Sequence, residues 1–474
     1  KGSGMLLTIF YTPIIITQLG NNYGLIAVGS LISYFMQTLI DAVSAWTYNH
    51  ESKKNINNKT SKRASLNFHL ITLTVLVITM IWALTIIFLA SSLNNKFEID
   101  SNLLILFLFA LGLAQISTFL VQQFEVLNYV KHSFYILQRV GVIRKWIGVA
   151  AVLLYFYFQS EIIIETIIIA HFIESVFIFI LYRKFFINYN LQNFDFNLFL
   201  KDLLDDNFFR FLFSHIFSGT SIYFVLFGFS YLVTAFYDGA YISAAAAVMV
   251  IFNTIILFAS FLTKPLLSLL SENFYNELDV EKSFIKSGKD LLIKKIFNIS
   301  LFFSLISFVA ILFFGDAVLN LWLGGLHSEF YSLLIICSCA YVVIIPSRAV
   351  SYALLFSGKM FLPAFLTYII SAIVYLYIFI NPSDNLENVA FVYVIGSGLS
   401  CLASSSIALK YADVDSKKLI SSGILMTLSL ASCLLCLSST YSIKYSGLSI
   451  ILLLLILILI KERKSVTWLV ALIR

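Results

Sequence analysis

The sequence predicts an all-α polytopic membrane protein with about 14 transmembrane helices. Of the 474 residues, 60% are hydrophobic and only 12% are charged, about half the charged share of a soluble domain. Apolar runs of roughly 20 residues also recur along the whole chain. This composition excludes a soluble enzyme and a nucleic-acid-binding domain. Continuously apolar stretches such as 103–109 and 450–460 exclude an outer-membrane barrel, whose strands alternate.

Each predicted helix is an apolar segment long enough to cross roughly 30 Å of hydrocarbon. In order, the segments are 2–18, 24–48, 68–93, 103–130, 134–158, 162–186, 208–233, 240–267, 291–314, 329–356, 361–380, 389–410, 419–438 and 445–460. The first contains Pro13, and the last precedes a basic tail. No A-x-A-like site follows the first run, so we expect no cleaved signal peptide.

Lys and Arg collect in alternate loops. The loop after the second helix and the tail at 461–464 are rich in both, whereas loops on the other side carry only Lys96 and Lys444. Positive residues mark the cytoplasmic side of a membrane protein. We therefore expect both termini in the cytoplasm, and we take the net charge of +6 as a signal of orientation.

The longest polar interruption, 188–207, has the apolar pattern of an amphipathic helix at the membrane surface. It predicts four parts: an N-terminal lobe at 1–187, the cytoplasmic linker at 188–207, a C-terminal lobe at 208–411, and two further helices with the basic tail at 412–474. The outer turns at 19–27 and 236–244 resemble each other, which favours a parallel internal repeat.

Ionisable groups inside spans are costly, and they usually mark a transport pathway or a buried pair. For a pathway we single out the cations Arg139, Arg144, Lys145, Arg210, Lys264 and Arg348, and the polar residues Gln122, Glu125, Asn128 and Asn253. Candidates for a titrating or ion-binding role are Asp41, His171 and Glu174.

Some of these residues have a plain structural alternative. Arg144 lines the pathway in the interpretation we favour, but it would otherwise pair with Glu174, which shares a helix face with His171. Arg210 and Lys264 could equally snorkel to the inner surface. Asp41 could equally make a packing hydrogen bond between helices.

Several short motifs resemble one family. They are the outer turn Leu19-Gly-x-x-Tyr23-Gly24 after a helix with Pro13, the inner loop at Gly358-Lys359, the Lys264-Pro265 helix end, and 314–322 at an outer helix end. Together with the span pattern, they make the chain similar to polysaccharide flippases of the O-antigen (Wzx-like) type. These belong to the multidrug/oligosaccharidyl-lipid/polysaccharide (MOP) exporter superfamily.

The resemblance implies two six-helix lobes around a central cavity, with two peripheral helices. It implies a transporter in the bacterial cytoplasmic (inner) membrane that moves polyprenyl-diphosphate-linked oligosaccharide from the inner to the outer leaflet. Arginine recognises phosphate by bidentate hydrogen bonds, so the mid-membrane cations would suit a diphosphate. We expect a monomeric transport unit. Membrane lipids and other polysaccharide assembly proteins are the expected partners.

No phosphate-binding loop for ATP, no metal cluster and no catalytic triad is recognisable, so we expect no cofactor beyond a coupling H⁺ or Na⁺. Two alternatives stay open. A cation-coupled multidrug exporter of the same superfamily would favour acidic rather than basic residues in its cavity. A membrane glycan polymerase would need large outer loops with charged residues, whereas the predicted outer loops are short.

Overall fold

The computed structural model describes residues 13–57, 64–97, 99–130, 134–159, 163–186, 208–252, 255, 282–323, 330–355, 361–383, 385–411 and 416–473. Within these ranges the chain is helical and contains no strand. Nine helices of the described ranges are long and apolar enough to cross a membrane. The predicted fold class is therefore confirmed: the protein is an all-α, multi-pass membrane protein.

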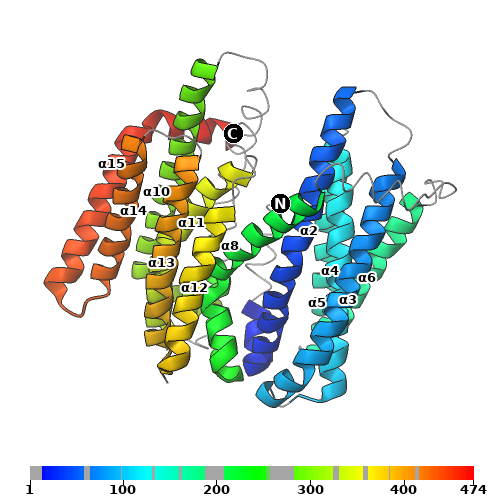
Figure 1. Ribbon diagram of the computed structural model, residues 1–474. Coiled ribbons are helices and arrows are strands. Elements are labelled where there is room, and N and C mark those ends of the chain that lie inside the picture. Colours follow the sequence, from blue (N-terminus) through cyan, green and yellow to red (C-terminus); the bar gives the residue numbers. More distant parts are fainter. Residues whose placement is uncertain are drawn as a thin grey trace. The chain divides into compact units, whose positions relative to one another are not determined.

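The helices follow the predicted spans closely (Figure 1). After a helical segment at 13–19 and a 3₁₀ turn at Gly20–Asn22, the long helices are α2 (Tyr23–Asn57), α3 (Ala64–Phe97), α4 (Ser101–Val130), α5 (Phe134–Gln159), α6 (Ile164–Phe186), α8 (Phe208–Phe236), α10 (Lys282–Leu323), α11 (Tyr331–Leu355), α12 (Phe361–Ile380), α13 (Leu386–Tyr411), α14 (Ser416–Cys436) and α15 (Tyr441–Ile473). A further apolar helix covers Gly239–Phe252.

Three helices continue well beyond the apolar runs that predicted them. Helix α2 extends to Asn57, α10 begins at Lys282, and α15 continues to Ile473. The residues of the basic tail predicted after residue 460 continue α15 as a helix. Lys, Glu and Arg are good helix formers, so a helix can leave the hydrocarbon without ending.

The chain groups into two compact units, Lys1–Ile216 with Tyr237–Ser243, and Phe217–Phe236 with Ala244–Arg474. The linker predicted at 188–207 and the boundary predicted at 412 lie outside the described residues. Those domain limits stay a prediction.

In the first unit, α4 is the central helix. It packs against α2, α3, α5 and α6, and these helices run side by side in Figure 1. Phe107 and Phe119 of α4 are fully buried. Helix α3 instead exposes a row of large apolar side chains, as a helix facing lipid would. A polar side chain on α4 is thus placed to meet its neighbours rather than lipid.

The two outer turns that resemble each other in sequence pack together in this unit. The Gly24 amide donates to Ser243 Oγ at 2.9 Å. A Cβ at Gly24 would lie 2.7 Å from the Phe97 ring, and one at Gly239 would lie 3.0 Å from the same ring. Both glycines are therefore required by close approach to Phe97.

In the second unit, α11 packs against α10, α13 and α14. Its residues from Leu333 to Ser347 are almost continuously buried. Tyr341 of α11 stacks on Phe252 with ring centroids 4.3 Å apart, and its hydroxyl donates to the Leu226 carbonyl of α8 at 2.6 Å. Apolar packing and hydrogen bonds of neutral hydroxyl groups thus both contribute to the core of the second unit.

Candidate functional site

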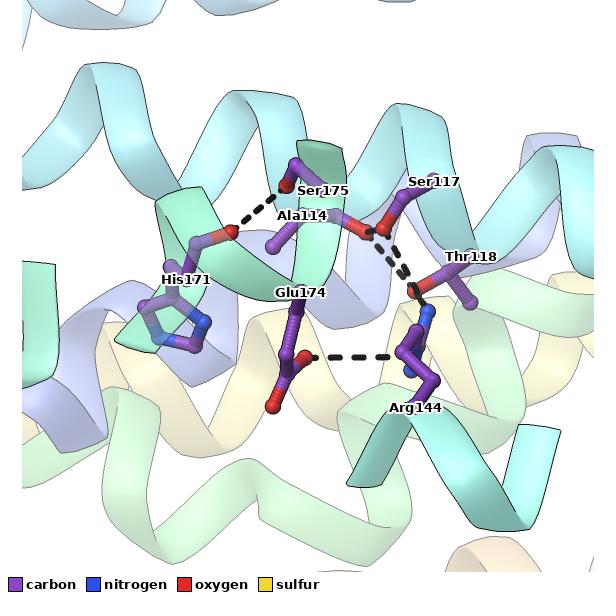
Figure 2. A network of polar contacts seen from close by, with 7 residues as sticks. All are labelled: Ala114, Ser117, Thr118, Arg144, His171, Glu174 and Ser175. Atoms are coloured by element: carbon purple, nitrogen blue, oxygen red, sulfur yellow. Dashed lines mark hydrogen bonds and ion pairs between the residues drawn. The ribbon is translucent and has the colours of Figure 1, made fainter. Parts of the chain in front are cut away.

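The first unit contains a charged pair between α5 and α6. Arg144 Nε lies 3.8 Å from Glu174 Oε2, and the two side chains are only 13% and 17% exposed. Arg144 Nη1 also donates to Thr118 Oγ1 of α4 at 2.7 Å, with Ser117 Oγ at 3.4 Å. Three helices thus converge on one guanidinium, as Figure 2 shows. We call Arg144, Glu174, Ser117 and Thr118 the arginine site.

The hydroxyl groups on α4 are oriented for this contact. Ser117 and Thr118 both donate to the Ala114 carbonyl at 2.8 Å. Because their protons point to that carbonyl, their oxygen lone pairs are available to accept from Arg144. The arginine site therefore offers the cation neutral acceptors on one side and a carboxylate on the other.

Gly148 makes room for the carboxylate. It lies one turn after Arg144 on α5, and a Cβ there would lie 1.8 Å from Glu174 Oε1 and 2.6 Å from its carboxyl carbon. Glu174 therefore packs directly on the α5 backbone. Any side chain at position 148 would force the carboxylate to move.

Two further titratable groups border the arginine site. The His171 ring lies beside Glu174 on α6 in Figure 2, and its Nδ1 is buried without a hydrogen bond in the described part of the chain. Lys145 follows Arg144 on α5 and is exposed. The pathway role predicted for Arg144 and the coupling role predicted for His171 and Glu174 stay predictions. The ion pair, which the sequence left as the alternative for Arg144, is the arrangement that the structure shows.

A second polar cluster lies between α2 and α4. Gln37 and Gln122 both donate from their amides to Asp41 Oδ1, at 2.8 Å and 3.2 Å. Ser44 bridges this group to α4, since it donates to Gln122 Oε1 at 3.3 Å and accepts from Gln123 at 3.0 Å. We call these five residues the aspartate cluster. Its chemistry is that of a carboxylate held by neutral amides, which suits a proton or a cation.

Helix α4 carries both groups on neighbouring turns. Thr118 of the arginine site and Gln122 of the aspartate cluster are four residues apart, so they lie on one face of the helix. A polar stripe along α4 therefore contacts both Arg144 of the arginine site and Asp41 of the aspartate cluster. The sequence predicted the acid, the cation and Gln122, but not the hydroxyls or Gly148. A Ser-Thr pair and a glycine one turn from an arginine are weak signals in an apolar helix.

The other predicted site residues are not tested by these contacts. The structure describes the backbone but not the side chains of Arg139, Arg210, Arg348, Glu125 and Asn128. Two more predicted site residues, Asn253 and Lys264, lie outside the described residues. Their convergence on the arginine site stays a prediction. Within the described ranges, no three His, Cys, Asp or Glu side chains lie close enough together to hold a metal ion.

The second unit has a pocket of a different kind. It is lined by hydroxyl and apolar groups of α8, α11, α12 and α13, including Ser221, Ser347, Thr367 and Ser404. None of the pocket's lining residues is charged. It therefore lacks the acid and cation that distinguish the first unit.

The sequence matches no protein-family model and no curated protein sequence. Solved structures are similar over most of the chain. A lipid II flippase, MurJ, matches with a TM-score of 0.64 at 14% identity, covering 98% of both chains. Two structures of a multidrug resistance MATE family transporter of the MOP superfamily also match, each at 12% identity and over 87% of this chain. The inward-facing structure has a TM-score of 0.61 and is covered over 95% of its chain. The outward-facing structure has a TM-score of 0.58 and is covered over 93%. At such low identity the likeness shows the fold alone, which this chain shares with the lipid II flippase and the MATE family transporter.

Proposed function

We propose that the protein is a flippase that moves polyprenyl-diphosphate-linked oligosaccharide from the inner to the outer leaflet of the bacterial cytoplasmic membrane by alternating access. The observation that carries the proposal is the arginine site, a cation held among three helices of a flippase-like fold. The likeness to a lipid II flippase over 98% of this chain supports a lipid-linked cargo.

The physical requirement for such a carrier is compensation of charge. A diphosphate loses its hydration shell when it enters hydrocarbon, and this is prohibitively costly unless protein groups replace the lost water. Arg144 is the described group best suited to do so, because a guanidinium binds phosphate oxygens in a bidentate manner. We propose that exposed Lys145 adds a second positive charge beside it. Arg139, Arg210, Lys264 and Arg348 are proposed to complete the cationic path, and Gln122, Glu125, Asn128 and Asn253 to face the sugars.

The driving force is proposed to be an ion or voltage gradient. The titratable candidates are Glu174 and His171 at the arginine site and Asp41 in the aspartate cluster, with H⁺ or Na⁺ as the coupling ion. Both termini are proposed to lie in the cytoplasm, and one chain is proposed to form the transport unit. Membrane lipids and other polysaccharide assembly proteins are the proposed partners.

A deletion strain tests the function directly. If the proposal is correct, lipid-linked repeat units accumulate in the inner leaflet and the surface polymer disappears, and both defects are reversed by the wild-type gene. Unchanged surface glycan in the deletion strain would refute the proposal.

The second candidate is a cation-coupled multidrug exporter. It is favoured by the aspartate cluster, in which an acid that accepts from two amides would suit an organic cation, and by the likeness to multidrug transporters. This candidate predicts normal glycan and raised sensitivity to cationic dyes in the same deletion strain. Loss of Asp41 would reproduce that sensitivity, whereas loss of Arg144 would not.

A further inference from the structure

We propose that the Arg144–Glu174 pair is an exchange site, in which an anionic group of the cargo replaces the Glu174 carboxylate on Arg144 while Glu174 takes up a proton from water. This inference rests on the proposed function, because it takes the cargo to carry a diphosphate. It adds a specific link between cargo and proton that the function by itself does not require.

The geometry favours exchange over simple addition. Arg144 is already held by Thr118 at 2.7 Å and by Glu174 at 3.8 Å, so a phosphate oxygen that approaches it competes with groups that are in place. Of these, the carboxylate contact, at Nε, is the longer one. The hydroxyl contacts anchor the guanidinium to α4 from the other side. The carboxylate is therefore the partner that an incoming anion can displace.

A displaced carboxylate cannot remain charged at this position without cost. Glu174 is 17% exposed and lies in an apolar span, Ile164–Leu181. An unpaired charge in such surroundings is far less stable than a neutral acid. Gly148 also limits how far the carboxyl group can retreat, because Glu174 packs directly on the α5 backbone. Protonation is the change that removes the charge without moving the helix.

The charge balance is simple. Before exchange, the guanidinium and the carboxylate cancel. After exchange, the guanidinium faces a phosphoryl oxygen and Glu174 is a neutral carboxylic acid, so one proton enters for each diphosphate bound. An O–H bond forms on Glu174 as one breaks in hydronium or in the buffer acid that donates the proton. The groups that face Glu174 are Arg144 and Lys145 on α5 and His171 on its own helix. Between Leu103 and Gln123, helix α4 contributes hydroxyl and amide groups but no titratable acid or base.

The test measures, by titration calorimetry, the binding of farnesyl diphosphate to the purified full-length protein in detergent. Measurements in two buffers with different ionisation heats give the number of protons taken up. Wild-type protein should take up about one more proton per diphosphate than Glu174→Gln, and its affinity relative to that variant should fall about tenfold per pH unit over the range in which Glu174 is ionised in the free protein and protonated in the complex. Glu174→Gln should bind more tightly at the upper end of this range, because its neutral amide does not compete.

Two controls complete the experiment. Glu165→Gln removes an exposed acid in the first turn of the same helix, α6, and it should keep the proton uptake. Inorganic diphosphate, which lacks the lipid, distinguishes recognition of the anion alone from recognition of the whole lipid.

The outcomes are distinct. Equal proton uptake and equal pH dependence in wild type and Glu174→Gln would overturn the exchange while leaving the flippase proposal intact. Failure of both proteins to bind either diphosphate would overturn the proposed cargo and the exchange together.

Discussion

The two units of the protein use buried polar groups in different ways. In the first unit, α4, α5 and α6 meet through the charged Arg144–Glu174 pair. In the second, buried tyrosine and serine hydroxyls join helices: Tyr341 and Tyr393 donate to carbonyls of α8 at 2.6 Å and 2.8 Å, and Ser405 donates to Ser347 at 2.7 Å. Neutral hydrogen bonds are the usual means of joining helices in lipid, whereas charges there are expensive and usually functional. The difference supports the proposal that cargo or ions act in the first unit.

The largest effect should come from Arg144→Ala. It removes the cation proposed to hold the diphosphate and leaves Glu174 buried without its partner, which costs about 3–5 kcal/mol for a fully buried pair and less for this partly exposed one. We expect surface glycan to be lost while the protein still inserts, as judged by glycan staining and membrane-fraction immunoblots.

A double variant, Arg144→Met with Glu174→Gln, separates stability from transport. It should recover most of the lost thermal stability, since no charge is left unpaired, but not the surface glycan. Normal glycan in this neutral variant would assign the pair a purely structural role.

The next effect concerns Gly148→Ala. The added methyl group would overlap Glu174, so we expect destabilisation of about 1–3 kcal/mol and weaker pairing with Arg144. The matched control is Gly423→Ala on α14, where a Cβ would meet nothing within 4 Å. That control should be neutral or stabilising by up to about 1 kcal/mol, because alanine is the better helix former. Thermal unfolding of both variants in detergent measures the two changes in stability. Equal changes would argue against the close packing of Glu174 on the α5 backbone.

A smaller effect is expected from Tyr341→Phe in the second unit. It removes one buried hydroxyl that donates to the Leu226 carbonyl but keeps the ring stacked on Phe252. The expected cost is about 1 kcal/mol of stability, with normal transport. A transport defect without a stability loss would contradict the view that this unit uses hydroxyls for packing.

The smallest effect on stability should come from Asp41→Asn, which conserves volume and keeps an oxygen that accepts from Gln37 and Gln122. A flippase whose cargo and proton both bind at the arginine site should keep its glycan, whereas lost glycan would assign the coupling ion to Asp41. Dye resistance and surface glycan are measured together. Lost dye resistance with intact glycan would favour the exporter.

Much of the helical architecture was predictable because lipid imposes a local rule. Every backbone group in the hydrocarbon must be satisfied internally, so an apolar run of roughly 20 residues becomes a helix wherever it occurs. The ends were less predictable, as α2, α10 and α15 show, because a helix needs no apolar side chains once it leaves the membrane. Of the site, the sequence identified Arg144, Glu174, His171 and Asp41 as unusual. For Arg144 it favoured a pathway and left the pair with Glu174 as the alternative, and the structure shows the pair.

The amino-acid sequence by itself determined the all-α membrane class and the identity of the few charges at depth, since both depend on composition along the chain. Only the tertiary structure decided which of those charges meet. Each residue turns a helix face by about 100°, so a contact between α5 and α6 depends on the rotation and spacing of both helices. Gly148 illustrates the reason. A glycine in an apolar helix does not by itself indicate a contact, yet the absence of a side chain at this position lets Glu174 reach Arg144.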